Sequence, residues 1–428
     1  MLSIVVPTAG VATAAAGLYL DTLAVASFFR RPGTSPVGDQ TDPLSRLVVL
    51  IPAHNEADLL GRCLATLKDQ SYSGERFSIV VIADNCTDAT ADIAASMGAQ
   101  VLVRKDPGAR GKGQALRWAM DQIVERPDAP DAVVVVDADS VADTHLLRGL
   151  AARLEAGAEV VQGEYLALTE DDSPASALRA AALLLFHRVR FSGRAALGMP
   201  CNLVGNGMLF SRRLLRDHPW SAFTSAEDLE YSIDLRLAGF RPVYAPEAGL
   251  RAPLPARGRA VSIQQLRWEG GRFHVVKTRL PKLVTAIVVA GRLDLLDAAI
   301  DLAVPPLGLL ALTAVGGTAV AGLLAASGAV PAWVVVPWLI GSLSIPAFVL
   351  LGLASAGATA GTYRSLGSAP RFVARSLLTR ARLLGGLRAT TWQRTERPSD
   401  AASTRAPDLD EVDSSAGHSK SGNGASSS

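Results

Sequence analysis

From Arg46 onward, short apolar runs alternate with longer segments in which apolar residues recur every three or four positions. The short runs are typical of buried strands, and the longer segments are typical of amphipathic helices. We therefore predict four strands, at 47–51, 77–83, 100–104 and 132–137, and helices between them at 56–70, 87–98 and 113–125. This alternation indicates an α/β fold with a mostly parallel sheet.

Three other stretches are apolar over a much greater length. The first covers residues 2–20, and its apolar character continues past Asp21 as far as Phe29. The other two, residues 302–326 and 331–356, contain no charged side chain. Each is close to or above the roughly 20 residues that a helix needs to cross the hydrocarbon core. A cleaved signal peptide carries its positive charge before the apolar run, whereas Arg30 and Arg31 follow it here, so we predict an uncleaved anchor. Only residues 327–330 separate the second and third stretches, which predicts a transmembrane hairpin.

The distribution of arginines predicts the orientation of these spans. Arg30 and Arg31 follow the first span, and six arginines between 364 and 388 follow the third. Such residues remain on the cytoplasmic side, so we expect a multi-pass plasma-membrane protein with a cytoplasmic catalytic domain. The expected division is a 1–30 anchor, a 31–45 linker, a 46–280 catalytic domain, a 281–300 interfacial helix, a 301–356 hairpin, a 357–397 basic amphipathic segment on the membrane surface and a 398–428 disordered tail.

Overall charge and cysteine content exclude several classes of protein. The 42 Lys and Arg residues nearly balance the 40 Asp and Glu residues, so nucleic acid is not an expected partner. The three cysteines, Cys63, Cys86 and Cys201, are far apart and form no C-x-x-C pair, which gives no sign of a disulfide framework or a zinc site.

Polar residues cluster where the predicted strands end. Residues 52–56, Asp84 with Asn85, and residues 137–139 follow three different strands. In parallel sheets, ligands bind beyond these carboxyl ends. Asp137 and Asp139 end an otherwise apolar run, and two close carboxylates suit Mg²⁺ or Mn²⁺ shared with the phosphates of a substrate. A solvated turn or a helix cap is the alternative for this D-x-D pair.

Three further segments carry candidate chemistry. The loop GARGKGQAL at 108–116 leads into a helix and suits a diphosphate, although it lacks the spacing of a P-loop. A helix at 224–240 opens with Glu227 and Asp228, which either do chemistry or only complement the helix dipole. The segment QQLRWEGGR at 264–272 places an arginine beside an indole, which suits either a phosphate and a sugar ring or the bilayer interface.

The order of these pieces resembles family 2 glycosyltransferases, the inverting GT-A enzymes, and especially the membrane synthases of poly-N-acetylglucosamine, hyaluronan and cellulose. The resemblance covers residues 46–280 and is carried by IPAHNE (51–56), ADNCTDAT (83–90), GKGQAL (111–116), DADS (137–140), AEDLE (226–230) and QQLRW (264–268). It implies a Rossmann-like nucleotide-sugar domain with flanking transmembrane helices.

The resemblance also implies a role for each matching residue. Glu56 and Asp84 correspond to contacts with the base and ribose, and Lys112 to the cation near the phosphates. Asp137 and Asp139 correspond to the pair that binds the donor and its Mg²⁺ or Mn²⁺. Asp228 corresponds to the general base, supported by Glu227. Arg267 corresponds to a contact with the leaving diphosphate, and Gln264 and Trp268 to contacts with the acceptor.

The resemblance implies inverting transfer of a sugar, UDP-linked by family default, to a saccharide or lipid-linked acceptor beside membrane lipids. Inversion needs one base on the acceptor hydroxyl, and the start of the helix should keep Asp228 ionised at neutral pH. The larger synthases often have four or more spans, whereas three are expected here, which puts processive polysaccharide synthesis in doubt. Homo-oligomerisation, extension of an oligosaccharide and glycosylation of a lipid all stay open.

Three rival interpretations remain. A polyprenyl-phosphate glycosyltransferase shares the first four motifs, but the QQLRW segment argues against it. A nucleotidyltransferase should have a glycine-rich loop after the first strand, where PAHNEADL contains no glycine. A non-catalytic membrane scaffold would not need Asp228.

Overall fold

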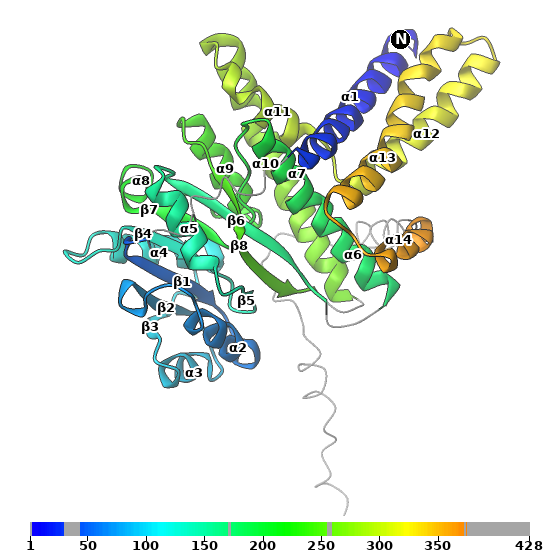
Figure 1. The fold of residues 1–428 in the computed structure, drawn as a ribbon. Helices are drawn as coiled ribbons and strands as arrows, with labels where there is room; N and C mark the ends of the chain where they lie inside the picture. The colour runs from blue at the N-terminus through cyan, green and yellow to red at the C-terminus, as the bar shows by residue number, and fades with distance from the viewer. Residues whose placement is uncertain (1, 30–42, 170–172, 255–258, 372–373, 375–428) are drawn as a thin grey trace, which may run out of the picture.

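The computed structural model describes residues 2–29, 43–169, 173–254, 259–371 and 374. It comprises a sheet covered by helices and a separate group of long helices that projects to one side (Figure 1). The expected linker lies largely outside the described residues, as do most of the basic segment after its first short helix and the whole of the tail.

The sheet has eight strands in the order β3-β2-β1-β4-β7-β6-β8-β5. The strands are β1 (Leu47–Ala53), β2 (Phe77–Asp84), β3 (Gln100–Arg104), β4 (Ala132–Val135), β5 (Val141–Ala142), β6 (Val160–Leu168), β7 (Met208–Ser211) and β8 (Val243–Pro253). β3, β2, β1 and β4 are mutually parallel. β7 is antiparallel to both β4 and β6, so β6 runs in the same direction as β4.

The four predicted strands are therefore confirmed, although β4 ends two residues earlier than expected. β4 is wholly buried and β1 nearly so, which explains why they read as continuous apolar runs; β3, at the edge of the sheet, is partly exposed. The carboxyl ends of β1, β2 and β4 meet at one edge, and the polar clusters predicted from the sequence follow them there.

Helices cover both faces of the sheet. One hydrophobic cluster joins the sheet to α2 (Ala57–Lys68), α3 (Thr90–Ser96) and α5 (Leu146–Glu155). The other joins it to α4 (Lys112–Val124), α8 (Arg212–Asp217) and α9 (Glu227–Leu237). The predicted helices at 56–70, 87–98 and 224–240 correspond to α2, α3 and α9, which are shorter, and the one at 113–125 corresponds to α4, which begins one residue earlier.

A long, irregular helix lies between the sheet and the projecting helices. It consists of α6 (Pro174–Leu184), a π-helical turn η2 (Leu185–Val189) and α7 (Arg190–Ala196). Sequence periodicity did not reveal it.

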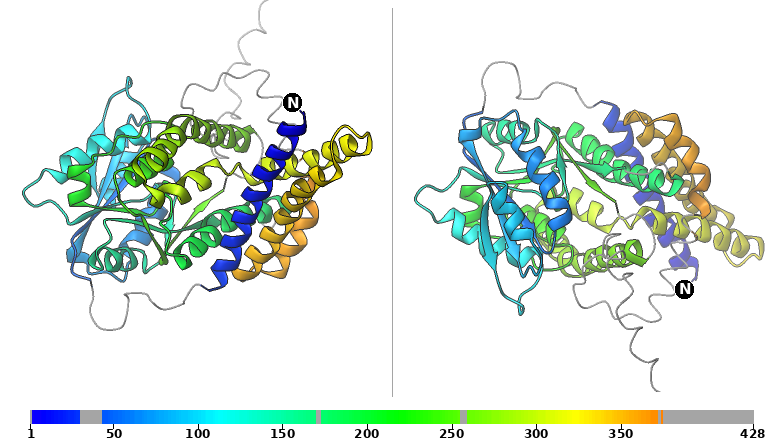
Figure 2. Two further views of the ribbon diagram at one scale, coloured as in Figure 1. Left: turned by 90° about the horizontal axis from the view of Figure 1, so that it is seen from above. Right: turned by 90° about the horizontal axis from the view of Figure 1, so that it is seen from below.

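In the described part of the chain, three helices are long and apolar enough to cross a membrane: α1 (Leu2–Phe28), α12 (Leu307–Ala326) and the segment Ala332–Ser355, which includes α13 (Val335–Ser355). They lie side by side in both views of Figure 2. Small residues allow α1 and α13 to approach closely, since a Cβ at Gly17 would lie 2.6 Å from Ser344 and one at Gly10 would lie 2.8 Å from Trp338. Close helix contact at glycines is typical of packing within membranes.

The interfacial helix expected at 281–300 is not a single helix. α10 (Arg259–Ala290) continues through residue 280 without a break, and the chain turns at Gly291, whose φ is 67°. The short turn η3 (Leu293–Leu295) and α11 (Leu296–Ala303) then run back against α10. Because glycine adopts positive φ at little cost, Gly291 divides a segment that reads as continuous in the sequence. The chain ends its described part with the short helices α14 (Ala360–Ser365) and η5 (Leu366–Ser368).

Candidate active site

The loops after β1 and β2 are fixed by two asparagines with positive φ. Asn55 has φ 55° and Asn85 has φ 51°, a region that asparagine tolerates better than most side chains. Asn55 accepts the Thr87 backbone N–H at 2.7 Å, and Asn85 accepts the Asp106 N–H at 2.8 Å. The loops that follow β1, β2 and β3 are thereby tied into one surface.

Glu56 and Asp84 both lie on this surface, as expected. Glu56 precedes α2 and its backbone N–H donates to Thr90 Oγ1 at 2.8 Å. Asp84 ends β2 and is only 6% exposed. Its Oδ1 accepts from Arg104 Nη1 at 2.7 Å, so part of its role is to hold that buried guanidinium.

Lys112 is the first residue of α4 and points across the carboxyl end of β4. Its Nζ donates to Asp137 Oδ1 and to the Gly205 carbonyl, both at 2.5 Å. Burial alone would lower the pKa of Lys112, but Asp137 and Glu227 outweigh it and raise that pKa. The lysine therefore stays charged. Gly113 is required beside it, because a Cβ there would lie 2.2 Å from the Ala222 carbonyl oxygen.

The aspartate pair is held from beneath by Asn206, which is completely buried. The Asp137 N–H donates to Asn206 Oδ1 at 3.1 Å, and Asn206 Nδ2 donates to Ser140 Oγ at 2.8 Å. One amide thus fixes both ends of the Asp137–Ser140 turn. Asp137 and Asp139 remain partly exposed above it.

Glu227 and Asp228 begin α9 and face the same site. The Leu229 N–H donates to Asp228 Oδ1 at 2.7 Å. A Cβ placed at Gly205 would lie 3.1 Å from Asp228 Oδ2 and 3.5 Å from Lys112 Nζ, so the two side chains meet over this glycine. Gly205 itself has φ 80°.

The expectation that the helix start keeps Asp228 fully ionised at neutral pH is wrong. Burial, followed by the charge of Glu227, raises the pKa of Asp228 to about 7, against the opposing Leu229 N–H and Lys112. Burial also raises the pKa of Glu227, against the opposing charges of Lys112 and Arg267. A carboxyl with a pKa near neutrality is well suited to accept and release a proton.

The QQLRW segment lies in the first half of α10. The charge of Arg267 acts on Glu227, and its carbonyl accepts from Ser225 Oγ at 3.0 Å, so this part of α10 packs beside the start of α9. Trp268 is 45% exposed and can present its ring to a ligand. The Gln264 side chain lies outside the described residues, although its backbone belongs to α10.

The donor set fits a hard divalent cation that is also bound by substrate. Asp137 and Asp139 supply carboxylate oxygens at a partly exposed edge. Within the described residues, no three His, Cys, Asp or Glu side chains form a group that could hold a metal. Mg²⁺ and Mn²⁺ are commonly held by one or two carboxylates together with substrate phosphates and water, which matches this pair.

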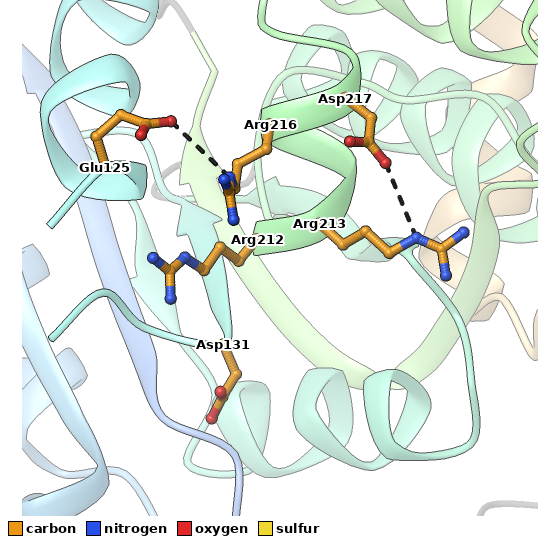
Figure 3. Close-up of a pocket in the computed structure, with 6 residues that line it drawn as sticks. All are labelled: Glu125, Asp131, Arg212, Arg213, Arg216 and Asp217. Atoms are coloured by element: carbon orange, nitrogen blue, oxygen red, sulfur yellow. Dashed lines mark ion pairs between the residues drawn. The ribbon is translucent and has the colours of Figure 1, made fainter. Parts of the chain in front are cut away.

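A hollow of about 520 Å³ lies elsewhere on the surface (Figure 3). It is lined by Glu125, Asp131, Arg212, Arg213, Arg216 and Asp217. Asp131 directly precedes β4, so this hollow lies at the amino end of the strand, opposite the aspartate pair. It takes no part in the site.

The structure adds residues that sequence reasoning missed. Asn206 and Gly205 belong to the segment VGNG, whose closely spaced glycines are a signal for a tight loop. Tyr165 lies in β6, and the charges of Asp139, Asp137 and Asp228 all act on it. Nothing in the sequence around it marked it.

Comparison with known proteins agrees with this geometry. The model of the family "Glycosyltransferase like family 2" matches residues 45–271. The probable glycosyltransferase YdaM of Bacillus subtilis is 25% identical over 244 residues, which cover 54% of this chain and 56% of that protein. An N-acetylglucosaminyltransferase of Rhizobium meliloti is 28% identical over 268 residues, which cover 57% and 59%. The chain therefore aligns with little more than half the length of these relatives.

A solved structure shows the same fold. The mannosyltransferase PcManGT from Pyrobaculum calidifontis, in complex with GDP-Man and Mn²⁺, has a TM-score of 0.51 and 16% identity, covering 82% of this chain and 98% of that one. The family match spans more than half of the 428 residues and includes the aspartate pair, Lys112 and Asp228. The chain is a member of the family 2 glycosyltransferases, with their α/β GT-A fold.

Proposed function

We propose that this protein transfers a sugar, with inversion, from a metal-bound nucleoside-diphosphate sugar to a hydroxyl of a saccharide or lipid-linked acceptor at the membrane. One observation carries the proposal: Lys112, Asp137 and Asp228 converge on Gly205. Lys112 Nζ binds Asp137 and the Gly205 carbonyl at 2.5 Å each, and Asp228 Oδ2 lies 3.1 Å from the Cβ position of that glycine.

This arrangement supports a single displacement, because the side chains that would carry it out lie close together. Lys112 remains charged and can stabilise the diphosphate as it leaves. Asp137 and Asp139 would hold Mg²⁺ or Mn²⁺, which when bound neutralises negative charge on that leaving group. The pKa of Asp228, about 7, suits a base that removes the proton of the acceptor hydroxyl.

The proposed reaction forms one bond and breaks one bond at the anomeric carbon. The acceptor oxygen forms a bond to the anomeric carbon while the bond from that carbon to the diphosphate oxygen breaks. The bonding electron pair leaves with the nucleoside diphosphate, and the proton of the acceptor passes to Asp228. No carboxylate needs to bond to the sugar, in contrast to a retaining glycosidase.

The donor is proposed by analogy. Two features favour a nucleotide sugar: the solved mannosyltransferase was bound to GDP-Man and Mn²⁺, and the rhizobial relative is named an N-acetylglucosaminyltransferase. Among donors, we propose a UDP-linked sugar, with N-acetylglucosamine tested first.

The location is also part of the proposal. Three helices of sufficient length and apolarity favour a membrane protein, and the arginines after the first and third of them favour a cytoplasmic catalytic domain. The donor would then come from the cytoplasm.

The test is to incubate membranes that contain the protein with a panel of labelled nucleotide sugars, with Mn²⁺, with Mg²⁺ or with a chelator. We expect one donor to label a saccharide or lipid fraction only when a divalent cation is present. Membranes that contain Asp139→Ala are the matched control. Labelling that persists in chelator would refute the metal part of the proposal, and no labelling from any donor would refute the transferase part.

A further inference from the structure

The end of β6 brings an unexpected tyrosine to the level of the aspartate pair. Gln162 of β6 and Val135 of β4 both pair with Met208 of β7. Tyr165 follows Gln162 by three residues, as Ala138 follows Val135, and Tyr165 packs against the hydrophobic cluster that contains Ala138. Two strand spacings, or about 10 Å, separate Gln162 from Val135. A tyrosine side chain spans a large part of that gap.

Two irregularities of the backbone surround this residue. The pairing of β6 with β8 shifts register between Gly163 and Glu164, and such bulges bend a strand and are common beside active sites. The π-helical turn Leu185–Val189 faces the same strand, and π-turns also occur often at functional sites. The register shift immediately precedes Tyr165, and His187 of the π-helical turn contacts it.

The π-turn holds the tyrosine in place through His187. The His187 Nδ1–H donates to the Tyr165 carbonyl at 2.7 Å, and the two rings lie 5.2 Å apart at 33°. His187 also stacks on Phe191 at 5.8 Å, and Phe191 contacts Tyr244 at 5.5 Å. Burial lowers the pKa of His187 to about 4, so this imidazole is neutral at physiological pH and serves as packing.

The hydroxyl of Tyr165 is free to bind a ligand. Its ring packs partly buried against the hydrophobic core, and a buried tyrosine hydroxyl usually has a hydrogen-bond partner. Among the residues that the structure describes, no hydrogen bond to this hydroxyl is found. Burial, then Asp139, Asp137 and Asp228, raise the pKa of Tyr165. The hydroxyl therefore remains protonated and is a donor.

The position of Tyr165 favours the acceptor side of the site. Lys112 and the loops after β1 and β2 form the opposite side, where the nucleotide is proposed to bind. The π-turn behind Tyr165 packs against the candidate membrane helix α13, since a Cβ at Gly352 would lie 2.6 Å from Leu185 and 3.2 Å from Val189. Tyr165 thus lies on the side from which a membrane-associated acceptor would enter.

We propose that the Tyr165 hydroxyl binds the acceptor sugar, donating a hydrogen bond to an oxygen next to the attacking hydroxyl. The proposal rests on the proposed transferase function. It predicts that Tyr165 affects transfer to a sugar but has no effect on the slow transfer of the same donor to water, because water needs no such contact.

The test uses Tyr165→Phe, which keeps the ring and its contact with His187. Membranes that contain the full-length chain are incubated with UDP-[¹⁴C]N-acetylglucosamine and Mn²⁺, and the label in saccharide and lipid products is compared with the label released as free sugar. If another nucleotide sugar proves to be the donor, it replaces this probe. We expect the ratio of transfer to hydrolysis to fall about three- to tenfold, the usual effect of one neutral hydrogen bond, with an unchanged KM for the donor.

Tyr244→Phe is the matched control, because it removes a hydroxyl from the same aromatic stack. That hydroxyl donates to Glu164 Oε1 at 2.9 Å. The control should keep the wild-type ratio. An unchanged ratio in Tyr165→Phe, whether both rates stay the same or both fall equally, would overturn the inference. A higher KM for the donor would also overturn it. A wild-type protein that neither transfers nor hydrolyses any nucleotide sugar would instead refute the proposed function.

Discussion

The raised pKa of Asp228 should make transfer depend on pH close to neutrality. The base must be deprotonated to accept the proton of the acceptor, and burial raises its pKa to about 7. With that value, about 9% of the carboxyl is ionised at pH 6 and about 91% at pH 8, so the rate should rise about tenfold between them. With an ordinary pKa near 3.8, it would be almost constant.

The assay is kcat/KM for the donor between pH 5 and 9 at fixed Mn²⁺, because this parameter reports groups of the free enzyme. Positive charge from a bound cation lowers the pKa of a carboxyl, so a midpoint between about 6 and 7 agrees with the structure. Asp228→Asn keeps the shape of the side chain but cannot accept a proton, and it should reduce transfer by about 10²–10⁴ and remove the pH-dependent limb. Nucleotide binding should persist, because Lys112 and the aspartate pair are unchanged.

The same variant should gain stability at high pH. The pKa of Asp228 is raised on folding, so its contribution to stability is present at low pH and is lost as pH rises from about 4 through 7. A shift of about three pH units corresponds to at most about 4 kcal/mol. The carboxyl is partly exposed, and its ionisation depends on that of Glu227, so the actual effect should be smaller. We expect Asp228→Asn to increase the free energy of unfolding by about 1–2 kcal/mol at pH 8 and by almost nothing at pH 4.

Thermal unfolding in detergent and chelator measures this gain. An activity profile with a midpoint below pH 5, or an Asp228→Asn variant that keeps more than about a tenth of the wild-type rate, would refute the assignment of the base. Glu227 and Glu230 would then be the next candidates.

Three other predictions follow from the structure. Asp139→Ala should reduce transfer at least about a hundredfold with little effect on expression, since the side chain is partly exposed at the sheet edge; normal activity of this variant would exclude it as a metal ligand. A reporter fused after Arg397 should be cytoplasmic and one inserted at Gly328, between α12 and α13, should be external; a cytoplasmic signal at Gly328 would mean that the hairpin does not cross. Asp301→Asn should cost about 3 kcal/mol of stability, because this buried carboxylate binds Arg190, Arg194 and Asn202. Asp294→Asn disrupts only an exposed pair with Arg292 and should leave the melting temperature nearly unchanged. Equal effects of the two substitutions on the melting temperature would contradict this account.

The sequence predicted the parts of the fold that depend on local pattern. The central parallel strands were visible because both of their faces are buried, as in Leu47–Ala53 and Ala132–Val135. The acids at their ends could be placed together because parallel strands end at one edge. The positions of Lys112, Asp137 and Asp139 at the ends of predicted elements were enough to place these side chains near that edge.

Other features depend on contacts between distant segments and could not be predicted in this way. Asn206 lies beneath Asp137 because β7 is antiparallel to β4, a pairing that the short sequence of β7 does not specify. The position of Tyr165 depends on two further strand pairings, that of β7 with β6 and that of β6 with β8. The ionisation of Asp228 was mispredicted because the helix start was considered without the burial and the Glu227 charge that outweigh it.

The anomeric configuration of the first-formed product tests the central claim most directly. Asp228 acts in this account only as a base, so the acceptor oxygen attacks the anomeric carbon once, from the face opposite the diphosphate. An α-linked UDP-sugar should therefore give a β-linked product, observed by proton NMR before any later equilibration. An α-linked product would require either two displacements through a carboxylate bonded to the sugar or attack from the same face as the leaving diphosphate, and either would contradict the mechanism.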